Sequence, residues 1–429
     1  MNKRILSVAV IAAMMGTTTQ VQAAGFQLAE YSATGLGRAY AGEAAMADNA
    51  AAQFRNPAML TYLEGTQMTT GAILVMPNID VDGEVTFADG GTSATSAKDI
   101  AGDAVVPNFY VSHQLNEQWF LGLALGSNFG MATELDDSFL GTQFGNEASI
   151  TAIEVNPNVA YRVNEQFSIG AGVRLVLGEG SFGAQAPTGT FVPAETTLKY
   201  MEGDDISWGW QLGGAWQINT DNRIGFNYRS EVEQNLEGEA KGLGFDIAMI
   251  MQGKKPSNHY DGAMELALPA TAEIASFHQL TEKLAVHASV NWTDWSTFEK
   301  LEAVIPEISA SPILVKQENW EDNYRFAVGA TYQLSQKSTL RTGIAYDQAA
   351  VSDANRTTTI PEVDRLWLSV GYGYQYSNNL DFDFGATYIF ADESPIHEHE
   401  EDSAKFGGTF EGQVSGNIIL VGVQATYRF

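Results

Sequence analysis

Apolar residues alternate with small or polar residues from about residue 66 to the end of this chain, and this period of two limits the fold more than any other feature. Within residues 380–390, for example, Phe382 and Phe384 alternate with Asp381 and Asp383. Further clear examples are residues 206–218, 324–334 and 419–429. Because successive side chains of a β-strand point to opposite faces, the pattern predicts strands that have one apolar face and one polar face.

A soluble sandwich would bury the apolar faces, whereas a membrane barrel would turn them toward lipid. Here the small and polar faces are as regular as the apolar faces, and aromatic residues gather near the strand ends. That pattern is typical of an outer-membrane barrel with a polar lumen and two aromatic girdles. No run of 18 apolar residues follows residue 23, which excludes membrane-spanning helices. We therefore expect the following residues to face lipid: Trp208, Trp210, Phe382, Phe384 and Phe390.

The connections between the alternating segments predict the number of strands. Six are short turns, at residues 115–118, 163–166, 219–222, 281–283, 335–337 and 377–379. Seven are long and polar or glycine-rich, near residues 77–103, 131–147, 181–203, 239–259, 299–317, 348–362 and 392–413. Short periplasmic turns and long extracellular loops are the asymmetry of outer-membrane barrels. We therefore predict an all-β transmembrane fold, a 14-stranded antiparallel barrel formed by residues 65–429.

The first 64 residues lack this alternation. Residues 1–23 have the pattern of an export signal: a basic start at Lys3 and Arg4, an apolar stretch, and small residues before a cleavage site after Ala23. The apolar stretch is too short for an anchor helix, which is the alternative interpretation. Residues 24–64 have the composition of short helices and turns. Because a fourteen-strand barrel is too wide for side chains to fill, we predict that they form a hatch inside the lumen.

Composition excludes several classes of function. The formal charge of −29 argues against nucleic acid as a partner, and the absence of cysteine removes thiol chemistry. The six histidines are scattered, and the pair at His397 and His399 lies in an acidic loop without fixed geometry. We expect no metal, no cofactor and no catalytic group. The terminal Phe429, at the end of an alternating strand, resembles the signal that the outer-membrane assembly machinery reads, and we expect a monomer surrounded by outer-membrane lipid and lipopolysaccharide.

Several short motifs, in order along the whole chain after residue 23, resemble the FadL family of outer-membrane long-chain fatty-acid transporters of Gram-negative bacteria. They are residues 24–28 (AGFQL), 35–40 (GLGRAY), 55–58 (RNPA), 127–134 (SNFGMATE), 228–231 (YRSE), 322–325 (DNYR) and 360–369 (IPEVDRLWLS). The resemblance implies passive uptake: the substrate docks on apolar extracellular loops, enters a lumen pocket, and leaves sideways into the bilayer at a kink in the third strand.

The resemblance places this gate at Asn128, Phe129 and Gly130, and we expect Asn56, Pro57 and Ala58 of the hatch to lie against it. A glycine and an amide side chain suit a place where ladder hydrogen bonds are missing. From position alone, these residues can equally begin the loop that follows the third strand. If they form a kink, deleting Asn128 and Phe129 together should straighten the strand and keep its inward and outward phase.

The ligand pocket is predicted from inward-facing apolar residues near the extracellular ends of the last strands: Trp367, Ile389, Ile418 and Leu420. The resemblance implies that Phe26 inserts there from the hatch. The alternative is that these residues pack on the hatch. The inward arginines Arg174, Arg325 and Arg365 are candidates for a carboxylate, because the guanidinium group binds carboxylates in a planar fork. The alternative is pairing with inward acids such as Glu154, Asp347 and Asp364.

One predicted loop contains an unusually apolar segment: Leu243, Phe245, Ile247, Met249, Ile250 and Met251. It can be a docking patch for greasy substrates or can fold over the barrel mouth. For the whole chain, uptake of long-chain fatty acids is the leading function. A second hypothesis is the same barrel carrying aromatic or other small hydrophobic compounds, and a third, of another class, is a membrane-embedded hydrolase or an adhesin.

Overall fold

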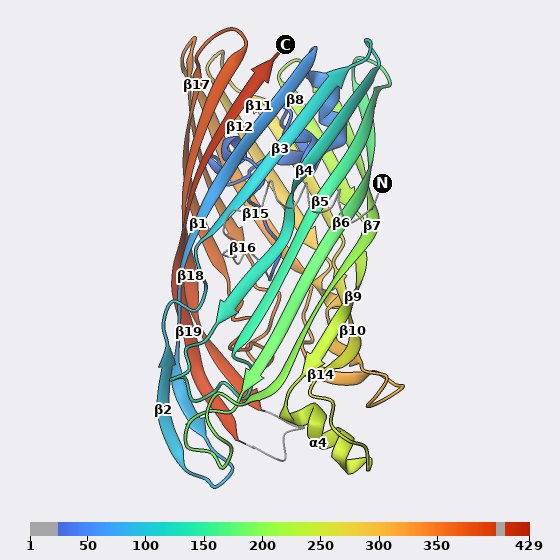
Figure 1. Cartoon of the computed structure of the whole chain (residues 1–429). Coiled ribbons are helices and arrows are strands. Elements are labelled where there is room, and N and C mark those ends of the chain that lie inside the picture. The colour runs from blue at the N-terminus through green and yellow to red at the C-terminus, as the bar shows by residue number, and fades with distance from the viewer. Residues whose placement is uncertain (1–24, 400–407) are drawn as a thin grey trace.

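A computed structural model describes residues 25–399 and 408–429 (Figure 1). The predicted signal peptide, residues 1–23, lies outside these ranges. The strands are β1 (Thr66–Thr86), β2 (Thr92–Ala97), β3 (Ala104–Gln114), β4 (Trp119–Glu134), β5 (Glu147–Arg162), β6 (Phe167–Gln185), β7 (Thr197–Asn219), β8 (Asn222–Arg229), β9 (Val232–Lys241), β10 (Tyr260–Leu268), β11 (Thr271–Gln279), β12 (Leu284–Thr293), β13 (Lys300–Val304), β14 (Ile313–Gln317), β15 (Asn323–Ser335), β16 (Ser338–Asp347), β17 (Arg365–Gln375), β18 (Leu380–His399) and β19 (Thr409–Arg428).

These segments form one closed antiparallel barrel of fourteen wall strands, as predicted. The barrel closes where β1 pairs with β19 from Gln67 opposite Arg428 to Thr86 opposite Thr409. Five wall strands are each interrupted once, which gives the consecutive pairs β2 and β3, β8 and β9, β10 and β11, β12 and β13, and β14 and β15. The two members of a pair lie one after the other along the same neighbouring wall strand; β7, for example, pairs with both β8 and β9.

All six predicted turns lie at one end of the barrel, at the top of Figure 1. The long connections lie at the other end, where the strands extend further than the sequence indicated. The ladder between β1 and β19 continues to Thr86, well inside the predicted loop 77–103. The strands continue because the alternation persists there with polar residues on the outward face, a pattern that resembles a loop by composition alone.

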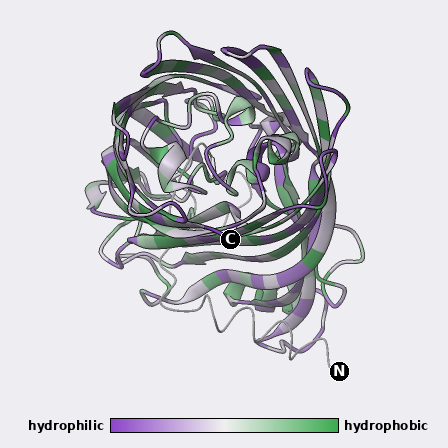
Figure 2. Ribbon diagram, turned by 90° about the horizontal axis from the view of Figure 1, so that it is seen from above, coloured by the Kyte–Doolittle hydropathy of each residue, from purple (hydrophilic) through white to green (hydrophobic). Residues whose placement is uncertain are grey.

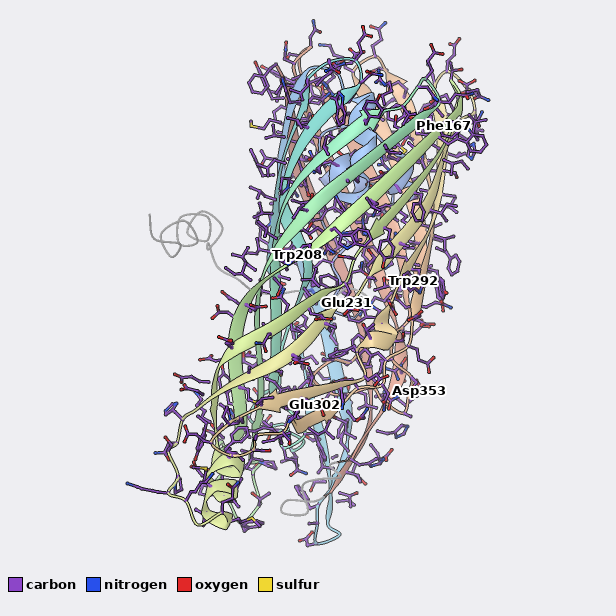
Figure 3. All side chains as sticks on the ribbon, turned by 90° about the vertical axis from the view of Figure 1, so that its right-hand side faces the viewer. Phe167, Trp208, Glu231, Trp292, Glu302 and Asp353 are labelled. Carbon is purple, nitrogen blue, oxygen red and sulfur yellow. The ribbon has the colours of Figure 1, made fainter. Side chains whose placement is uncertain are left out.

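The outer surface carries a broad apolar band. Trp208 is 69% exposed, and Trp210, Phe384 and Phe390 are exposed as predicted, while Phe382 is half-buried. Figure 3 shows Phe167 near the end with the short turns, Trp208 farther along, and Glu302 and Asp353 toward the end with the long loops. Since lipid-facing side chains need no partner, this band is the membrane-embedded part of the wall.

Residues 25–64 lie inside the barrel, where Figure 2 shows coils within the ring of strands. They form short helices: α2 (Ala33–Leu36), η1 (Glu43–Ala45), α3 (Ala52–Arg55) and η2 (Pro57–Tyr62). Ser32 caps α2 through its hydroxyl, and Asn56 caps η2, which has proline in its first turn. Glycines let the hatch approach the wall: a Cβ on Gly37 would lie 2.7 Å from the backbone of Gly371.

Two more helices lie outside the hatch, α4 (Leu243–Met251) and η3 (Trp295–Thr297). None of the helices in the described ranges is long and apolar enough to span a membrane.

Candidate functional site

Phe26 is fully buried in a cluster of aromatic rings in the extracellular half of the lumen. Its ring centroid lies 4.6 Å from that of Trp295, 5.5 Å from Phe298, 5.9 Å from Trp320 and 6.1 Å from Phe129. The Trp295 and Phe298 rings meet it edge to face, the geometry that aromatic pairs favour. We call these five residues the aromatic cluster.

The wall strands are interrupted where three of these rings enter the lumen. Trp295 and Phe298 lie between β12 and β13, and Trp320 lies between β14 and β15. Residues three positions apart on a regular strand would point to opposite faces, so the break between β12 and β13 lets both Trp295 and Phe298 turn inward. Sequence reasoning missed all three rings. The available signal was the loss of alternation at residues 294–299 and 318–322.

The aromatic cluster is continuous with a larger set of buried apolar side chains from the strands around it. Members from at least five wall strands include Met131, Val176, Met201, Val232, Leu236, Met264, Leu266, Leu301 and Ile305. Few of these positions stood out in the sequence, because each is one inward residue on an ordinary alternating strand. Together they form one continuous apolar region in the lumen.

The predicted kink in the third wall strand is a β-bulge at Asn128. Ser127 pairs with Ile153 of β5, but the next pair is Phe129 with Ala152, so Asn128 is an extra residue in the ladder. A one-residue bulge reverses the inward and outward phase of everything beyond it. Phe129 and Met131 would otherwise face lipid, and the bulge turns both into the lumen, where they are buried.

The wall is interrupted on the other side of β4 at the same level. β3 pairs with β4 only as far as Phe109 with Leu125. Beyond that pair, residues 104–108 continue to pair with β1, and residues 126–134 continue to pair with β5. Within the described residues, therefore, no ladder joins β3 to β4 between this pair and the end of the barrel with the long loops. The sequence predicted such a gap only through the family resemblance.

Residues 25–28, which we call the N-terminal segment, occupy the free edge of β4 from inside the barrel. Leu28 N donates to Asn128 O at 2.6 Å, and Gly130 N donates to Phe26 O at 2.8 Å. Gln27 forms an isolated antiparallel bridge with Phe129. The same segment thus fills the aromatic cluster with a side chain and satisfies the exposed backbone groups of β4.

Asn56, Pro57 and Ala58 do not lie against the bulge, contrary to the prediction. The Asn56 amide nitrogen donates to Gly214 O on β7 at 3.0 Å. A Cβ on Gly170 of β6 would lie 2.5 Å from Ala58 N, so Pro57 and Ala58 pack on that glycine. The rigid turn fits where glycines on β6 and β7 leave room for it, nearer the turn end of the barrel, and residues 26–28 take the place at the bulge.

Trp367, Ile389, Ile418 and Leu420 are brought together, but away from Phe26. They are fully buried in a cluster with the hatch residues Tyr31, Leu36 and Tyr40 and other neighbours. The Trp367 ring lies 6.5 Å from the Tyr40 ring, edge to face. Packing on the hatch was the alternative interpretation of these residues, and the geometry agrees with it. Phe26 has other neighbours because the N-terminal segment runs from the hatch toward β4.

The three candidate arginines have protein partners. Arg174 Nε donates to Glu154 at 2.9 Å, and Arg325 Nη2 donates to Ala39 O at 2.9 Å with Asp347 at 4.0 Å. Arg365 lies 3.9 Å from Glu362, whereas Asp364 accepts instead from Ala349 N. Pairing with acids was the alternative interpretation. It agrees with the structure for Arg174 and Arg325, and Arg365 pairs with a different acid.

A charged layer lies directly on the hatch side of the aromatic cluster. Arg325 lies in β15 shortly after Trp320, and Asp347 and Arg365 face it from β16 and β17. Glu30 of the hatch adds a second buried carboxylate near the two arginines. An apolar chain moving toward the hatch from the aromatic cluster would have to enter this layer, at a large desolvation cost.

Glu362 anchors the N-terminal segment to an extracellular loop. Its carboxylate accepts hydrogen bonds from Gly25 N and Ala350 N, both at 2.9 Å. The side chain is almost completely buried, and this desolvation raises the pKa of the Glu362 carboxyl to about 7, although Arg365 opposes the shift. Glu318, which accepts from Trp320 Nε1 at 3.1 Å, has its pKa raised to about 7 for the same reason.

Two lysines that sequence reasoning missed lie at the outer end of the apolar region. Lys316 and Lys199 lie 5.7 and 5.8 Å from the ring centroid of Phe182, a member of the apolar set. Lys316 pairs with Glu398 at 2.8 Å. Both lysines line a cavity of about 330 Å³ that also contains Arg356. Lys316 fell inside a stretch that was expected to be loop, where no alternation marked its direction.

The apolar loop segment forms helix α4. Part of the helix folds over the barrel mouth and part is exposed as a docking patch would be, so it combines the two alternatives. Met249 is buried in the apolar region and Phe245 packs against it, whereas Ile250 and Met251 are exposed, Met251 to 77%. One face of the helix therefore covers the pocket region and the other presents apolar side chains to the outside. Leu243 and Ile247 are half-buried.

Comparison with known proteins adds a family to this geometry. Residues 14–429 match the family described as outer membrane protein transport protein (OMPP1/FadL/TodX). A long-chain fatty acid transport protein of Escherichia coli O6:H1 is 34% identical, and the match covers 96% of each chain. Outer membrane protein P1 of Haemophilus influenzae is also 34% identical, over 100% of this chain and 99% of its own.

Solved structures share the fold. A crystal structure of a Pseudomonas aeruginosa FadL homologue superposes with a TM-score of 0.86 at 23% identity, covering 95% of this chain and all of the other. The toluene transporter TbuX of Ralstonia pickettii gives 0.68 at 19% identity, covering 94% and 100%. The fold, the lipid-facing band and the matched relatives place this protein in the bacterial outer membrane as a transporter of hydrophobic compounds. The chain belongs to the outer membrane protein transport protein family (OMPP1/FadL/TodX).

Proposed function

We propose that this barrel takes up long-chain fatty acids without an energy source. In this proposal the substrate is captured at the extracellular loops, binds in the apolar region around Phe26, and leaves sideways between β3 and β4. Its route ends in the bilayer, so the acyl chain never crosses the periplasmic mouth into water.

The observation that carries the proposal is the double role of residues 25–28. Phe26 fills the aromatic cluster, and its own carbonyl and the Leu28 amide bond the edge of β4 beside the interruption. A ligand that displaces the Phe26 ring must therefore also disturb the hydrogen bonds that cover this edge. Occupation of the pocket and exposure of the gap are linked through three consecutive residues.

The charged layer supports the sideways direction. An apolar chain that continues from the aromatic cluster past Phe129 and Met131 stays against buried apolar side chains, but toward the hatch it meets Arg325, Asp347 and Arg365. Burying roughly 15 methylenes at about 0.8 kcal/mol each favours the apolar region over water by up to about 12 kcal/mol.

The outer cavity supports a substrate with an anionic head group. The protein is strongly acidic, yet Lys199, Lys316 and Arg356 line one cavity at the extracellular end of the apolar region. A carboxylate held there could leave its acyl chain against Phe182 and the residues beyond it. The exposed apolar side chains of α4, Ile250 and Met251, lie on the same end of the barrel and are suited to first capture.

A second candidate substrate class is small aromatic hydrocarbons. The rings of Trp295, Phe298, Trp320 and Phe129 around Phe26 form a site in which another ring can take the same edge-to-face contacts. This candidate makes no use of the lysines in the outer cavity.

Competition binding distinguishes the two classes. Purified protein should bind oleate, measured by calorimetry, and toluene should compete weakly. Replacing Lys199 and Lys316 together by Gln should weaken oleate binding and leave the binding of a hydrocarbon of equal length unchanged. The fatty-acid proposal fails if the double variant binds oleate as tightly as the parent does. It also fails if the purified protein binds toluene more tightly than oleate.

A further inference from the structure

Glu154 of β5 is a buried carboxylate that uses both oxygens. Oε1 accepts from Asn156 Nδ2 at 2.8 Å and from Arg229 Nη2 at 2.6 Å. Oε2 accepts from Arg174 Nε at 2.9 Å and, in a short contact, from the amide nitrogen of Asn128. Glu154, Arg174 and Arg229 are each at most 3% exposed. An ion triad this deep is costly to desolvate and is weak evidence for stability by itself, so its position calls for another explanation.

The triad connects three special features of the barrel. Through Asn128 it reaches the bulge of β4, and through Arg174 Nη1, which donates to Ser230 O at 2.6 Å, it reaches the break between β8 and β9. Arg229 Nη1 donates to Gln211 Oε1 at 2.9 Å and to the backbone oxygen of Phe54 in the hatch. Glu154 contacts Asn128, Arg174 and Arg229, the three residues that make these contacts.

Asn128 is held by two hydrogen bonds, one to the N-terminal segment and one to the barrel wall. Its backbone oxygen accepts from Leu28 N, a bond that is lost when the N-terminal segment moves. Its side chain is bonded to Glu154, which belongs to the wall and does not depend on the hatch. Without both of these hydrogen bonds, β4 is freer to straighten and pair with β3.

We propose that Glu154 is a positioning residue for the lateral gate: it keeps Asn128 in the bulge after the N-terminal segment has left, so that the gap stays open. The inference rests on the lateral exit proposed above and adds the residue on which the open state depends. Glu154 does not touch the substrate. It acts through Asn128, with Arg174 and Arg229 fixing the orientation of its carboxylate.

The straightened state has a defined register. Continuing the ladder beyond Phe109 and Leu125 places Val105 of β3 opposite Phe129. In the present structure Val105 points outward, 50% exposed, while Phe129 is buried in the lumen. Loss of the bulge without loss of a residue would turn position 129 outward and bring it next to position 105.

The first test is Glu154→Gln, which preserves shape and removes the charge. We expect uptake of radiolabelled oleate by cells to fall to the level of cells without the protein, while the purified variant binds oleate with affinity within about twofold of the parent. Asp383→Asn is a matched control, because Asp383 pairs with Arg341 at 2.7 Å in the lumen and is buried to a similar degree. It should leave uptake unchanged.

A second variant guards against misfolding. Glu154→Gln combined with Arg174→Gln removes one charge of each sign, so the net charge of the triad is preserved, and it should lose uptake equally. Folding is checked for each variant by surface display and heat-modifiable mobility. Normal uptake in any folded variant that lacks the Glu154 carboxylate would overturn the proposal.

A cysteine pair reports the straightened strand directly, because the chain has no other cysteine. Val105→Cys with Phe129→Cys should form a disulfide in the Glu154→Gln background and remain reduced in the parent background. A pair that behaves identically in both backgrounds would contradict the inference. Failure of the lateral exit itself has a different signature, since deleting Asn128 would then leave uptake intact whatever residue occupies position 154.

Discussion

The ladders of the barrel wall are interrupted at several places, and two of these interruptions differ in what satisfies the exposed backbone. Between β3 and β4, the edge of β4 is covered by residues 26–28 of the hatch. Between β7 and β9, the regular ladder stops between Gln211 with Arg229 and Asp204 with Glu237. There the wall supplies the partners itself: the Ser230 hydroxyl accepts from Trp210 N at 2.9 Å, and Asp205 accepts from Asn235 N at 3.0 Å.

The comparison shows why a missing ladder is not by itself a gate. Backbone groups facing lipid must be bonded, since an unpaired group there costs several kcal/mol. Fixed side chains of the wall give a permanent solution, which keeps β7 and β9 together. A hatch segment gives a removable one, because displacing it exposes the gap. Of these two interruptions, only the one between β3 and β4 has a partner that can leave.

The largest expected effect comes from removing the bulge. Deleting Asn128 alone should let Phe129 pair with Ala152 in continuous register and allow β4 to pair with β3, so cells should no longer grow on oleate as sole carbon source. Deleting Asn128 and Phe129 together, the change favoured by the sequence, would reverse the phase beyond the deletion, because the bulge already uses one residue. Growth, with surface display as the check on folding, is the measurement.

The next effect tests the hatch side of the comparison. Phe26→Ala should weaken oleate binding about tenfold, the loss expected when one ring of a packed aromatic site is removed. Phe410→Ala is the matched control, because Phe410 is equally buried but packs on Phe139 in a different cluster. Calorimetry measures the oleate affinity of both variants. An equal loss of affinity in the two would contradict the placement of Phe26 in the ligand site.

The attachment of the N-terminal segment should depend on pH, whereas the barrel wall should not. Burial raises the pKa of Glu362 from 4.5 to about 7, so ionisation is harder in the folded protein than in the unfolded chain. The protonated carboxyl therefore contributes about 1–3 kcal/mol to the free energy of unfolding. This contribution is complete below pH 4.5 and is lost as the pH rises through 7. Proteolysis of the N-terminal segment should become faster from pH 6 to pH 8, and Glu362→Gln should abolish that change.

The smallest effect is expected at the permanent seam. Asp205→Ala leaves the Asn235 amide without its partner and should lower the free energy of unfolding by about 1 kcal/mol, measured by urea titration in lipid vesicles. Oleate uptake should not change. Reduced uptake in this variant would mean that the interruption between β7 and β9 also conducts substrate, and the distinction between the two interruptions would be lost.

Much of the fold could be predicted because it depends on local patterns. The turns at residues 115–118 and 163–166 and the alternation at 380–390 follow from the period of a strand and the chemistry of turns, which a single sequence displays. Phe26 and the bulge at Asn128 came from resemblance to a family, since one extra residue in a ladder leaves no periodic signal.

The rest depends on three-dimensional packing. Asn56, Pro57 and Ala58 lie on Gly170 and Gly213 because those glycines leave space, a relation between residues more than 100 positions apart. Trp295, Phe298 and Trp320 enter the lumen where strands break, and the sequence shows there only an absence of alternation. The partners of Arg174 and Arg365 were decided by which acid lies nearest in space.

The most direct test of the lateral exit is to locate the substrate on its way out. An oleate analogue with a photoreactive diazirine near the methyl end, taken up by cells and activated by light, should label residues 104–108 of β3 and 126–130 of β4. The alternative route passes a polar cavity of about 240 Å³ at the turn end, lined by Asp48, Arg341 and Arg428 among others. Labels on that cavity, with none at β3 and β4, would contradict the lateral exit.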